Sequence, residues 1–286
     1  MQTRRDFLGR AAAGLAVMGL ETLAFAEKAE RPLGVQLYTV RSLVGNDLPG
    51  TLKAIRKIGY RYVETFVAQY KMSAKDLRKA IEDAGLTAPS THFGYNDFEA
   101  RLDYAKELGT ECVVCSMIPP SIADSADGYK RGADQYNAWA AKAKTMGMRF
   151  GFHNHNVEFK EYGGTTGIEL LLQHTDPALV QWQMDCYWVA QAGHDPVALL
   201  RQYGKRIQSL HVKDRLPNVP TSLELGPDAA HFTEVGGGTL DWKTLLQLAG
   251  TEHIPYLFVE QDQTERPPLE SLQISYNNLT RLLKQS

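Results

Sequence analysis

The feature that most constrains the fold of this chain is a regular alternation of short apolar runs with longer helical patterns, which starts at residue 33 and occurs eight times. The apolar runs predict strands at residues 33–39, 62–66, 87–93, 112–118, 148–153, 180–185, 207–212 and 256–260. The helical patterns predict helices at residues 48–58, 74–84, 98–108, 136–146, 167–174, 196–203, 242–249 and 269–283. Glycine follows several of these helices, as at Gly59 and Gly85, where a helix C-cap favours positive φ.

Eight strand-then-helix units in about 250 residues favour a closed (β/α)₈ TIM barrel, an α/β fold, over an open doubly wound sheet. A dinucleotide-binding fold is disfavoured because no GxGxxG motif follows the first strand. No low-complexity segment interrupts the chain, so we expect residues 27–286 to form a single domain. In such barrels the functional groups lie at the carboxyl ends of the strands.

The first 26 residues have the pattern of a targeting segment. Arg4 and Arg5 form a twin-arginine pair, residues 11–20 are apolar, and a small-residue cleavage pattern ends at Ala26. The apolar stretch is shorter than the roughly 20 residues that span a bilayer, which disfavours a membrane anchor. We therefore predict a twin-arginine signal peptide over residues 1–26, export to the periplasm or the extracellular space, and no stable membrane insertion after cleavage.

Charge and cysteine content argue against a nucleic-acid-binding protein and against a protein built on a disulfide framework. The formal net charge of −2 leaves no basic excess for a nucleic-acid surface. The three cysteines, Cys112, Cys115 and Cys186, are an odd number, which argues against a disulfide framework. Cys112 and Cys115 have the spacing of a redox motif, but they lie within an apolar run and are predicted to pack in the core.

Ionisable side chains stand at the ends of the last four predicted strands. They are His153 and His155, Asp185, His211, and Glu260. Burying carboxylates and imidazoles is costly unless they are paired or bound to a cation, so the repeated pattern predicts a shared divalent metal. A set of carboxylates with one or two imidazoles suits Mn²⁺, our first choice, or Mg²⁺, Co²⁺ or Zn²⁺, and the absence of thiolates argues against a closed structural zinc site.

Side chains alternate along a strand, so His153 and His155 share one face and are expected to point to the barrel mouth. Glu158, in the loop that follows, can fold back toward the same point. Asp185 could instead cap a helix, but Asp195, which precedes a proline, is the better cap for the next helix. We therefore expect Asp185 to be free for the site.

Further candidates are expected at the same mouth. They are Glu64, His92, Lys213 and Arg215, while Trp188 could form part of a wall for a sugar-sized pocket. Charged residues also end strands simply to reach water, but together these groups offer a base, a cation and polar contacts, as carbonyl chemistry requires. Residues 217–231 form a long irregular connection, which we expect to influence specificity and to be able to close over the site.

Four segments resemble one known family. FHNHNVEF at 152–159, MDCYWVAQAG at 184–193, LHVKD at 210–214 and VE at 259–260 resemble the sugar phosphate isomerase/epimerase family with the xylose isomerase-like barrel. The resemblance covers essentially the whole mature chain. It implies a divalent metal at the barrel mouth and chemistry on a keto- or aldo-sugar through an enediolate or a related carbanion.

The resemblance implies three metal ligands, which are Asp185, His211 and Glu260. In keto-sugar epimerases such as D-tagatose 3-epimerase, the fourth ligand is a glutamate at the end of strand five, where this chain has His153. Either His153 takes that place or Glu158 reaches back from the loop; we prefer Glu158, since two histidines then remain for proton transfer. Those epimerases also have a histidine where this chain has Trp188, so the chain departs from their two-carboxylate pattern.

The sequence therefore predicts an exported, metal-dependent isomerase, epimerase or keto-sugar lyase that abstracts a proton next to a carbonyl. His153 or His155 would move the proton, and Lys213 would stabilise negative charge. The predicted sugar contacts are Glu64, His92, Trp188 and Arg215. Export favours a free or glycosidically linked sugar over a sugar phosphate, and a homo-oligomer is compatible with the sequence. The alternatives are a non-catalytic sugar-binding barrel and an endonuclease IV-like hydrolase, which would need more histidine ligands and a basic groove.

Overall fold

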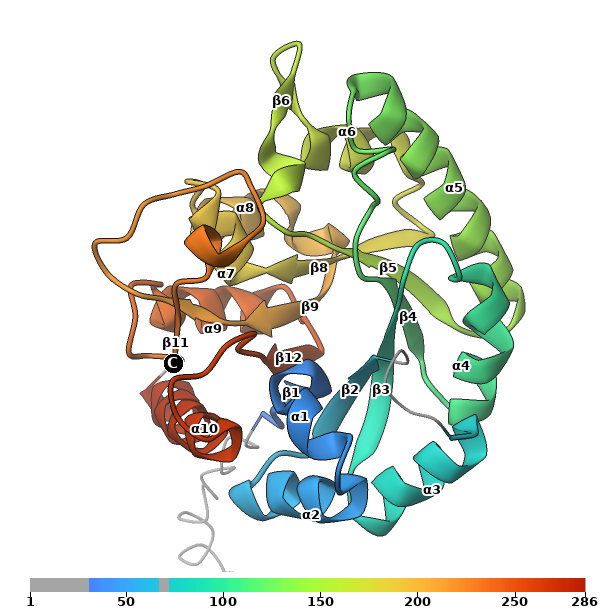
Figure 1. The fold of residues 1–286 in the computed structure, drawn as a ribbon. Coiled ribbons are helices and arrows are strands. Elements are labelled where there is room, and N and C mark those ends of the chain that lie inside the picture. The colour runs from blue at the N-terminus through green and yellow to red at the C-terminus, as the bar shows by residue number, and fades with distance from the viewer. Residues whose placement is uncertain (1–30, 67–71, 286) are drawn as a thin grey trace, which may run out of the picture. The chain divides into compact units, whose positions relative to one another are not determined.

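A computed structural model of the chain describes residues 31–66 and 72–285. The predicted signal peptide lies outside these residues. Eight parallel strands form a closed barrel in which each strand pairs with its neighbours in chain order and the last pairs with the first (Figure 1). They are β1 (Gly34–Gln36), β2 (Tyr62–Phe66), β3 (Thr87–Phe93), β4 (Cys112–Cys115), β5 (Arg149–His153), β8 (Val180–Asp185), β9 (Ile207–Val212) and β12 (Tyr256–Val259). The predicted (β/α)₈ barrel is confirmed.

Helices surround the barrel on its outside (Figure 1). Those that follow the barrel strands are α2 (Leu48–Ile58), α3 (Ala74–Asp83), α4 (Leu102–Leu108), α5 (Ala126–Thr145), α6 (Gly167–His174), α8 (Pro196–Tyr203), α9 (Trp242–Thr251) and α10 (Pro268–Gln285). Two shorter helices, α1 (Arg41–Val44) and α7 (Cys186–Gln191), lie at the strand ends. No helix among the described residues is long and apolar enough to span a bilayer.

Two short hairpins complete the described structure. Strand β6 (Glu161–Tyr162) pairs with β7 (Thr165–Thr166), and β10 (Asp214–Arg215) pairs with β11 (Phe232–Thr233). The second hairpin joins the two ends of the 217–231 connection, because Arg215 pairs with Phe232. The connection is thereby held at its base beside the end of β9.

Helix α5 differs most from its prediction, because it begins at Ala126 rather than at residue 136. Its first half contains two glycines, which reduce helix propensity and so hide the helix in the sequence. Gly132 packs so closely on Ile118 that an added Cβ would lie 2.4 Å from the isoleucine Cδ1 atom. The side chain of Ser125 caps the first turn by accepting a hydrogen bond from the Gly128 amide. Tertiary packing and the cap therefore outweigh the local preference.

Strand β1 is shorter than predicted, since it ends at Gln36 and the chain continues as a 3₁₀ turn, Leu37–Val40. The Gln36 side chain accepts a hydrogen bond from the Tyr38 amide and so caps this turn. Cys112, Cys115 and Cys186 are all buried free thiols, which confirms the predicted place of Cys112 and Cys115 in the core.

Candidate metal centre and active site

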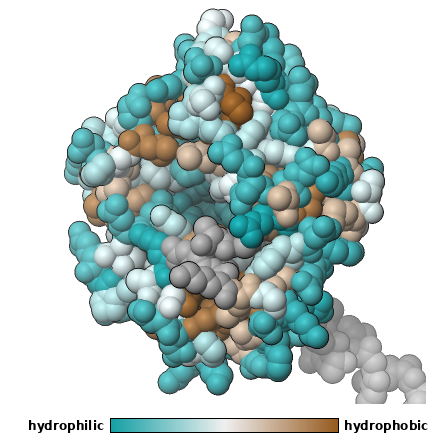
Figure 2. Space-filling model, turned by 45° about the vertical axis from the view of Figure 1, so that its right-hand side comes forward, coloured by the Kyte–Doolittle hydropathy of each residue, from teal (hydrophilic) through white to brown (hydrophobic). Residues whose placement is uncertain are grey.

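A cavity of about 410 Å³ lies at the carboxyl ends of the strands. Its wall includes His92, His153, His155, Lys213, Glu260 and Asp262. Figure 2 shows a hollow in the middle of the viewed face, with largely hydrophilic visible walls. The volume falls in the range of about 300–1,000 Å³ that is typical of small-molecule sites. Asp262 was not predicted, although it lies two residues after Glu260, the spacing that places side chains on the same side of an extended chain.

Asp185, His211 and Glu260 converge from neighbouring strands. Asp185 pairs with His211 in the β8–β9 register, and Glu260 directly follows β12 on the other side of β9. The three side chains are buried, and their candidate ligand atoms all lie within 4.8 Å of one another. The Nδ1 atom of His211 is 2.8 Å from Glu260 Oε2 and 3.8 Å from Asp185 Oδ2. The three ligands implied by the resemblance therefore form one cluster, called the ligand cluster below.

Asp185 is not free of a capping role, and the expectation that it would be is wrong. Helix α7 begins directly after it, and Asp185 Oδ1 accepts a hydrogen bond of 2.9 Å from the Trp188 amide. The sequence pattern predicts the next helix only after Asp195, and α7 is an additional helix that was not predicted. The second oxygen, Oδ2, is buried without a hydrogen bond and lies 3.6 Å from His153 Nε2. The cap thus orients the carboxylate so that one oxygen faces the cluster.

Asn154 links the ends of β5 and β8 through hydrogen bonds, and this role was not predicted from the sequence. Its Oδ1 atom accepts hydrogen bonds of 2.9 Å from the Asp185 amide and from Trp182 Nε1. Asn154 is fully buried. These two hydrogen bonds fix the position of the Asp185 backbone. The helix cap fixes the Asp185 side chain.

The structure does not bring Glu158 into the ligand cluster, although it was the preferred fourth ligand. Glu158 Oε2 accepts a hydrogen bond of 2.8 Å from the His155 amide, and Oε1 is buried without a partner. His153 lies closer, since its ring centroid is 4.6 Å from that of His211 and its Nε2 faces Asp185. Of the two alternatives left open by the sequence, the geometry favours His153.

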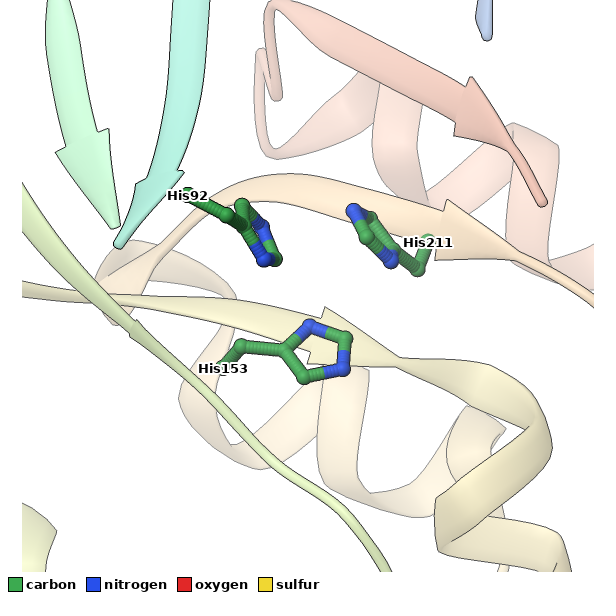
Figure 3. Close-up of side chains that lie close together, drawn as sticks. All are labelled: His92, His153 and His211. Atoms are coloured by element: carbon green, nitrogen blue, oxygen red, sulfur yellow. The ribbon is translucent and has the colours of Figure 1, made fainter. Parts of the chain in front are cut away.

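Three imidazoles meet at the cavity, where His92, His153 and His211 project from β3, β5 and β9 (Figure 3). The rings of His92 and His211 are stacked, with centroids 5.3 Å apart and planes inclined by 9°. Their nitrogens could hold an ion as a set. They are already engaged, because Gln183 Oε1 lies 2.6 Å from His92 Nε2 and 3.1 Å from His153 Nδ1, and Glu64 Oε2 lies 2.5 Å from His211 Nε2. The trio therefore shares His211 with the ligand cluster, and His92 and His153 pack beside that ring.

Glu64 was predicted to contact the sugar, but it lies beneath the cavity with no exposed surface. Its carboxylate accepts hydrogen bonds from the amides of Gln36 and Gln183, at 2.9 and 2.7 Å. Burial alone would raise the pKa of Glu64, but His92 and His211 outweigh it and hold the pKa well below its usual value. Glu64 thus remains ionised and orients His211, as a carboxylate behind a ligating imidazole does.

Trp188 and Arg215, two further predicted sugar contacts, are not on the described cavity wall. Trp188 is buried, with its ring 5.4 Å from that of His155 and 5.7 Å from Lys213 Nζ. The Arg215 guanidinium donates hydrogen bonds to Gln191 Oε1 and to the Val219 carbonyl oxygen, both at 2.7 Å. Arg215 therefore holds the start of the 217–231 connection, and Trp188 packs behind the cavity wall.

Lys213 is buried among three carboxylates. Its Nζ lies 3.0 Å from Asp185 Oδ2, 2.7 Å from Glu260 Oε2 and 2.8 Å from Asp262 Oδ1. Against the effect of burial, these neighbours hold the pKa of Lys213 well above its usual value. Burial would raise the pKa of Glu260, but Lys213 and His211 lower it to about 2. For Asp262 burial prevails over the attraction of Lys213 and raises the pKa to about 6.

The charges of the ligand cluster fit a divalent cation. Against the effect of burial, Glu64 and Glu260 raise the pKa of His211 to about 10, which favours the cationic form of the ring. His211 and Lys213 together supply two positive charges to the carboxylates, which equals the charge of a divalent ion. Oxygen and imidazole donors also suit Mn²⁺, Co²⁺ or Zn²⁺. Asp185, His211 and Glu260, with His153 beside them, are the residues that would hold such an ion.

His155 lies on the cavity wall, and its Nδ1 atom is buried without a hydrogen-bond partner. Burial, followed by the positive charge of Lys213, lowers the pKa of His155 to about 3. The ring is therefore neutral near pH 7. The unused nitrogen of a neutral imidazole on a cavity wall is a hydrogen-bond acceptor for a bound molecule.

Glu158 provides a prediction about stability and pH. Burial raises its pKa from the usual 4.5 to about 7, so the folded protein keeps a proton that the unfolded chain releases. The free energy of unfolding should therefore fall as pH rises from about 4.5 to about 7, by about 3 kcal/mol from this group. Glu158→Gln should remove this part of the pH dependence, as measured by urea denaturation at pH 5 and pH 8. The exposed control Glu161→Gln should retain it, and a Glu158→Gln curve parallel to wild type would refute the assignment.

The barrel and its ligand cluster define the class of protein. The chain belongs to the xylose isomerase-like TIM barrel family, whose sequence pattern matches residues 52–270. The predicted resemblance is therefore confirmed. An inosose dehydratase from Clostridium tetani (strain Massachusetts / E88) is 30% identical over 236 residues, which cover 71% of this chain and 78% of that protein.

Solved structures share the fold. A sugar phosphate isomerase/epimerase from Parabacteroides distasonis ATCC 8503 superposes with a TM-score of 0.77 at 25% identity and covers 89% of this chain and 95% of its own. The IOLI protein with a bound zinc atom superposes with a TM-score of 0.67 at 16% identity, covering 89% of this chain and 98% of its own. At that identity the second likeness concerns the fold alone.

Proposed function

We propose that this chain is a metal-dependent enzyme that abstracts a proton next to a carbonyl of a sugar or sugar derivative, as an isomerase, epimerase or keto-sugar lyase. The observation that carries the proposal is the ligand cluster of Asp185, His211 and Glu260 beside a cavity that is also lined by His155, whose Nδ1 has no hydrogen-bond partner. The names of the relatives support the same chemistry, since dehydration beside a carbonyl and sugar isomerisation can both begin by removal of such a proton.

The ligand cluster would hold the metal through Asp185, His211 and Glu260, with His153 as the neighbouring donor. A bound divalent ion supplies Lewis-acid polarisation of the carbonyl and stabilises the negative charge on the substrate oxygen. Mn²⁺ remains our first choice, and the zinc atom of the IOLI protein supports Zn²⁺ as an alternative. Glu64 keeps the His211 ring in place through its hydrogen bond to Nε2.

His155 is the group to which we assign the proton transfer. It lies on the cavity wall and its Nδ1 has no competing partner, whereas His153 Nδ1 lies 3.1 Å from Gln183 Oε1. Lys213 also lines the cavity, and its ammonium could donate a hydrogen bond to an oxygen that becomes negative once it is released from Asp185 and Glu260. The two residues thus offer a base for the carbon-bound proton and a donor for the resulting oxyanion.

Export through the twin-arginine pathway is part of the proposal and rests on Arg4, Arg5 and the apolar stretch that follows them. An exported enzyme meets free or glycosidically linked sugars more than sugar phosphates, and we propose the former as substrates. Cell fractionation of the full chain and of an Arg4→Lys/Arg5→Lys variant tests this point. Equal amounts of both proteins retained with the cytoplasm would refute export.

Hydrogen exchange in D₂O tests the chemistry before the product is known. The metal-loaded protein is incubated with inososes, keto-sugars and 3-keto-glycosides, and ¹H NMR follows the proton next to the carbonyl. We expect exchange or turnover with at least one compound, and loss of both in His155→Gln with metal content unchanged. Saturable binding without exchange across the panel would instead favour the sugar-binding barrel.

A further inference from the structure

The contacts of Lys213 conflict with the use of the ligand cluster by a metal. Its Nζ lies 3.0 and 2.7 Å from Asp185 Oδ2 and Glu260 Oε2, the same two oxygens that face His211 Nδ1. A divalent ion held by these oxygens and an ammonium in contact with them would be neighbouring like charges with little water between them. Such a pair repels strongly in a buried site. The ammonium and the metal therefore compete for the same two carboxylates.

Asp262 offers Lys213 another partner. The Lys213 ammonium donates a hydrogen bond of 2.8 Å to Asp262 Oδ1. The Asp262 side chain is 21% exposed and lies on the cavity wall, whereas Asp185 is fully buried. Asp262 is thus on the cavity side of the ammonium. A shift of Nζ toward Asp262 would move the ammonium away from the ligand cluster and would keep this hydrogen bond.

We propose that Asp262 is a positioning residue that draws the Lys213 ammonium off Asp185 and Glu260 when a divalent metal binds, so that metal binding also presents Nζ to the cavity. Without the metal, Lys213 serves as the internal cation of the ligand cluster. When the metal is bound, Lys213 keeps Asp262 as its counter-ion and faces the substrate. The inference rests on the proposed metal site and adds the residue that makes this site compatible with a buried lysine.

A double-mutant cycle on metal affinity tests this coupling. Zn²⁺ and Mn²⁺ affinities are measured at one pH by competition with a chromophoric chelator for wild type, Lys213→Met, Asp262→Asn and the double variant. Lys213→Met removes the competitor and should tighten binding about tenfold or more. Asp262→Asn leaves Lys213 without its second partner and should weaken binding by about tenfold in wild type. In the Lys213→Met background, Asp262→Asn should change the affinity by less than about twofold.

Asp97→Asn is the matched charge control, since Asp97 lines the same cavity but pairs with Arg101. It should weaken metal binding much less than Asp262→Asn. This comparison decides the matter even if Lys213→Met, which leaves carboxylates unpaired, fails to fold. Equal effects of Asp262→Asn and Asp97→Asn, or of Asp262→Asn in both backgrounds, would overturn the inference and leave the metal site standing. No metal binding by wild type or any variant would overturn both.

Discussion

Asp185→Asn is expected to abolish turnover while the barrel remains folded. The asparagine oxygen can still accept the hydrogen bond from the Trp188 amide that caps α7, so the local structure should persist. The change removes the negative charge of a buried carboxylate that we propose as a metal ligand, and turnover should fall by more than the roughly 10- to 100-fold typical of residues that merely support ligands. Activity and thermal stability of the metal-free protein, measured together, separate loss of the site from loss of the fold.

Asp195→Asn is the matched control for this variant. Asp195 also caps a helix, since its Oδ1 accepts a hydrogen bond of 2.8 Å from the Val197 amide at the start of α8, but it is exposed. The same chemical change there should leave turnover within about twofold of wild type, as expected of surface substitutions away from the site. Turnover by Asp185→Asn comparable to that of the control would remove Asp185 from the mechanism.

Glu64→Leu is expected to destabilise the protein by about 3–5 kcal/mol. It removes the carboxylate that pairs with a buried charged group and accepts several hydrogen bonds, so these groups are left without a partner. Glu64 is held by His211, Gln36 and Gln183, none of which can reach water in its place. Glu64→Gln keeps the shape and one acceptor, so it should fold but bind metal about 10- to 100-fold more weakly. Urea denaturation and a metal titration measure the two effects.

Glu82→Leu serves as the surface comparison for Glu64→Leu. Glu82 pairs with Arg78 across one turn of α3, with more than half of its side chain exposed. Removing such a pair costs about 0.5 kcal/mol or less. If Glu64→Leu were no more destabilising than Glu82→Leu, the buried network beneath the cavity could not have the role assigned to it.

The sequence predicted the barrel and the three strand-end residues of its ligand cluster because both follow from local pattern. Short apolar runs alternating with helices define the strands, and parallel pairing brings their carboxyl ends to one rim. Asp185, His211 and Glu260 needed no further information, since each stands at a strand end. Their meeting within 4.8 Å is a consequence of adjacent strands in register.

The remaining roles depend on contacts between distant parts of the chain, which local pattern does not contain. Glu64 is 147 residues from His211 in the sequence, so only the closed barrel reveals that it orients this ring. Lys213 and Asp262 are 49 residues apart, and their pairing is equally hidden. Glu158 was preferred as the fourth ligand because two histidines would then remain for proton transfer, but in the structure its carboxylate accepts a hydrogen bond from the His155 amide.

Metal content of the purified protein, measured by elemental analysis for wild type, Asp185→Asn and Asp195→Asn, tests the metal site most directly. We expect close to one equivalent of Mn, Zn, Co or Mg in wild type and in Asp195→Asn, and loss of the metal in Asp185→Asn. Wild-type protein that is folded, free of metal and unable to take up any of these ions would contradict a metal site at this rim of the barrel.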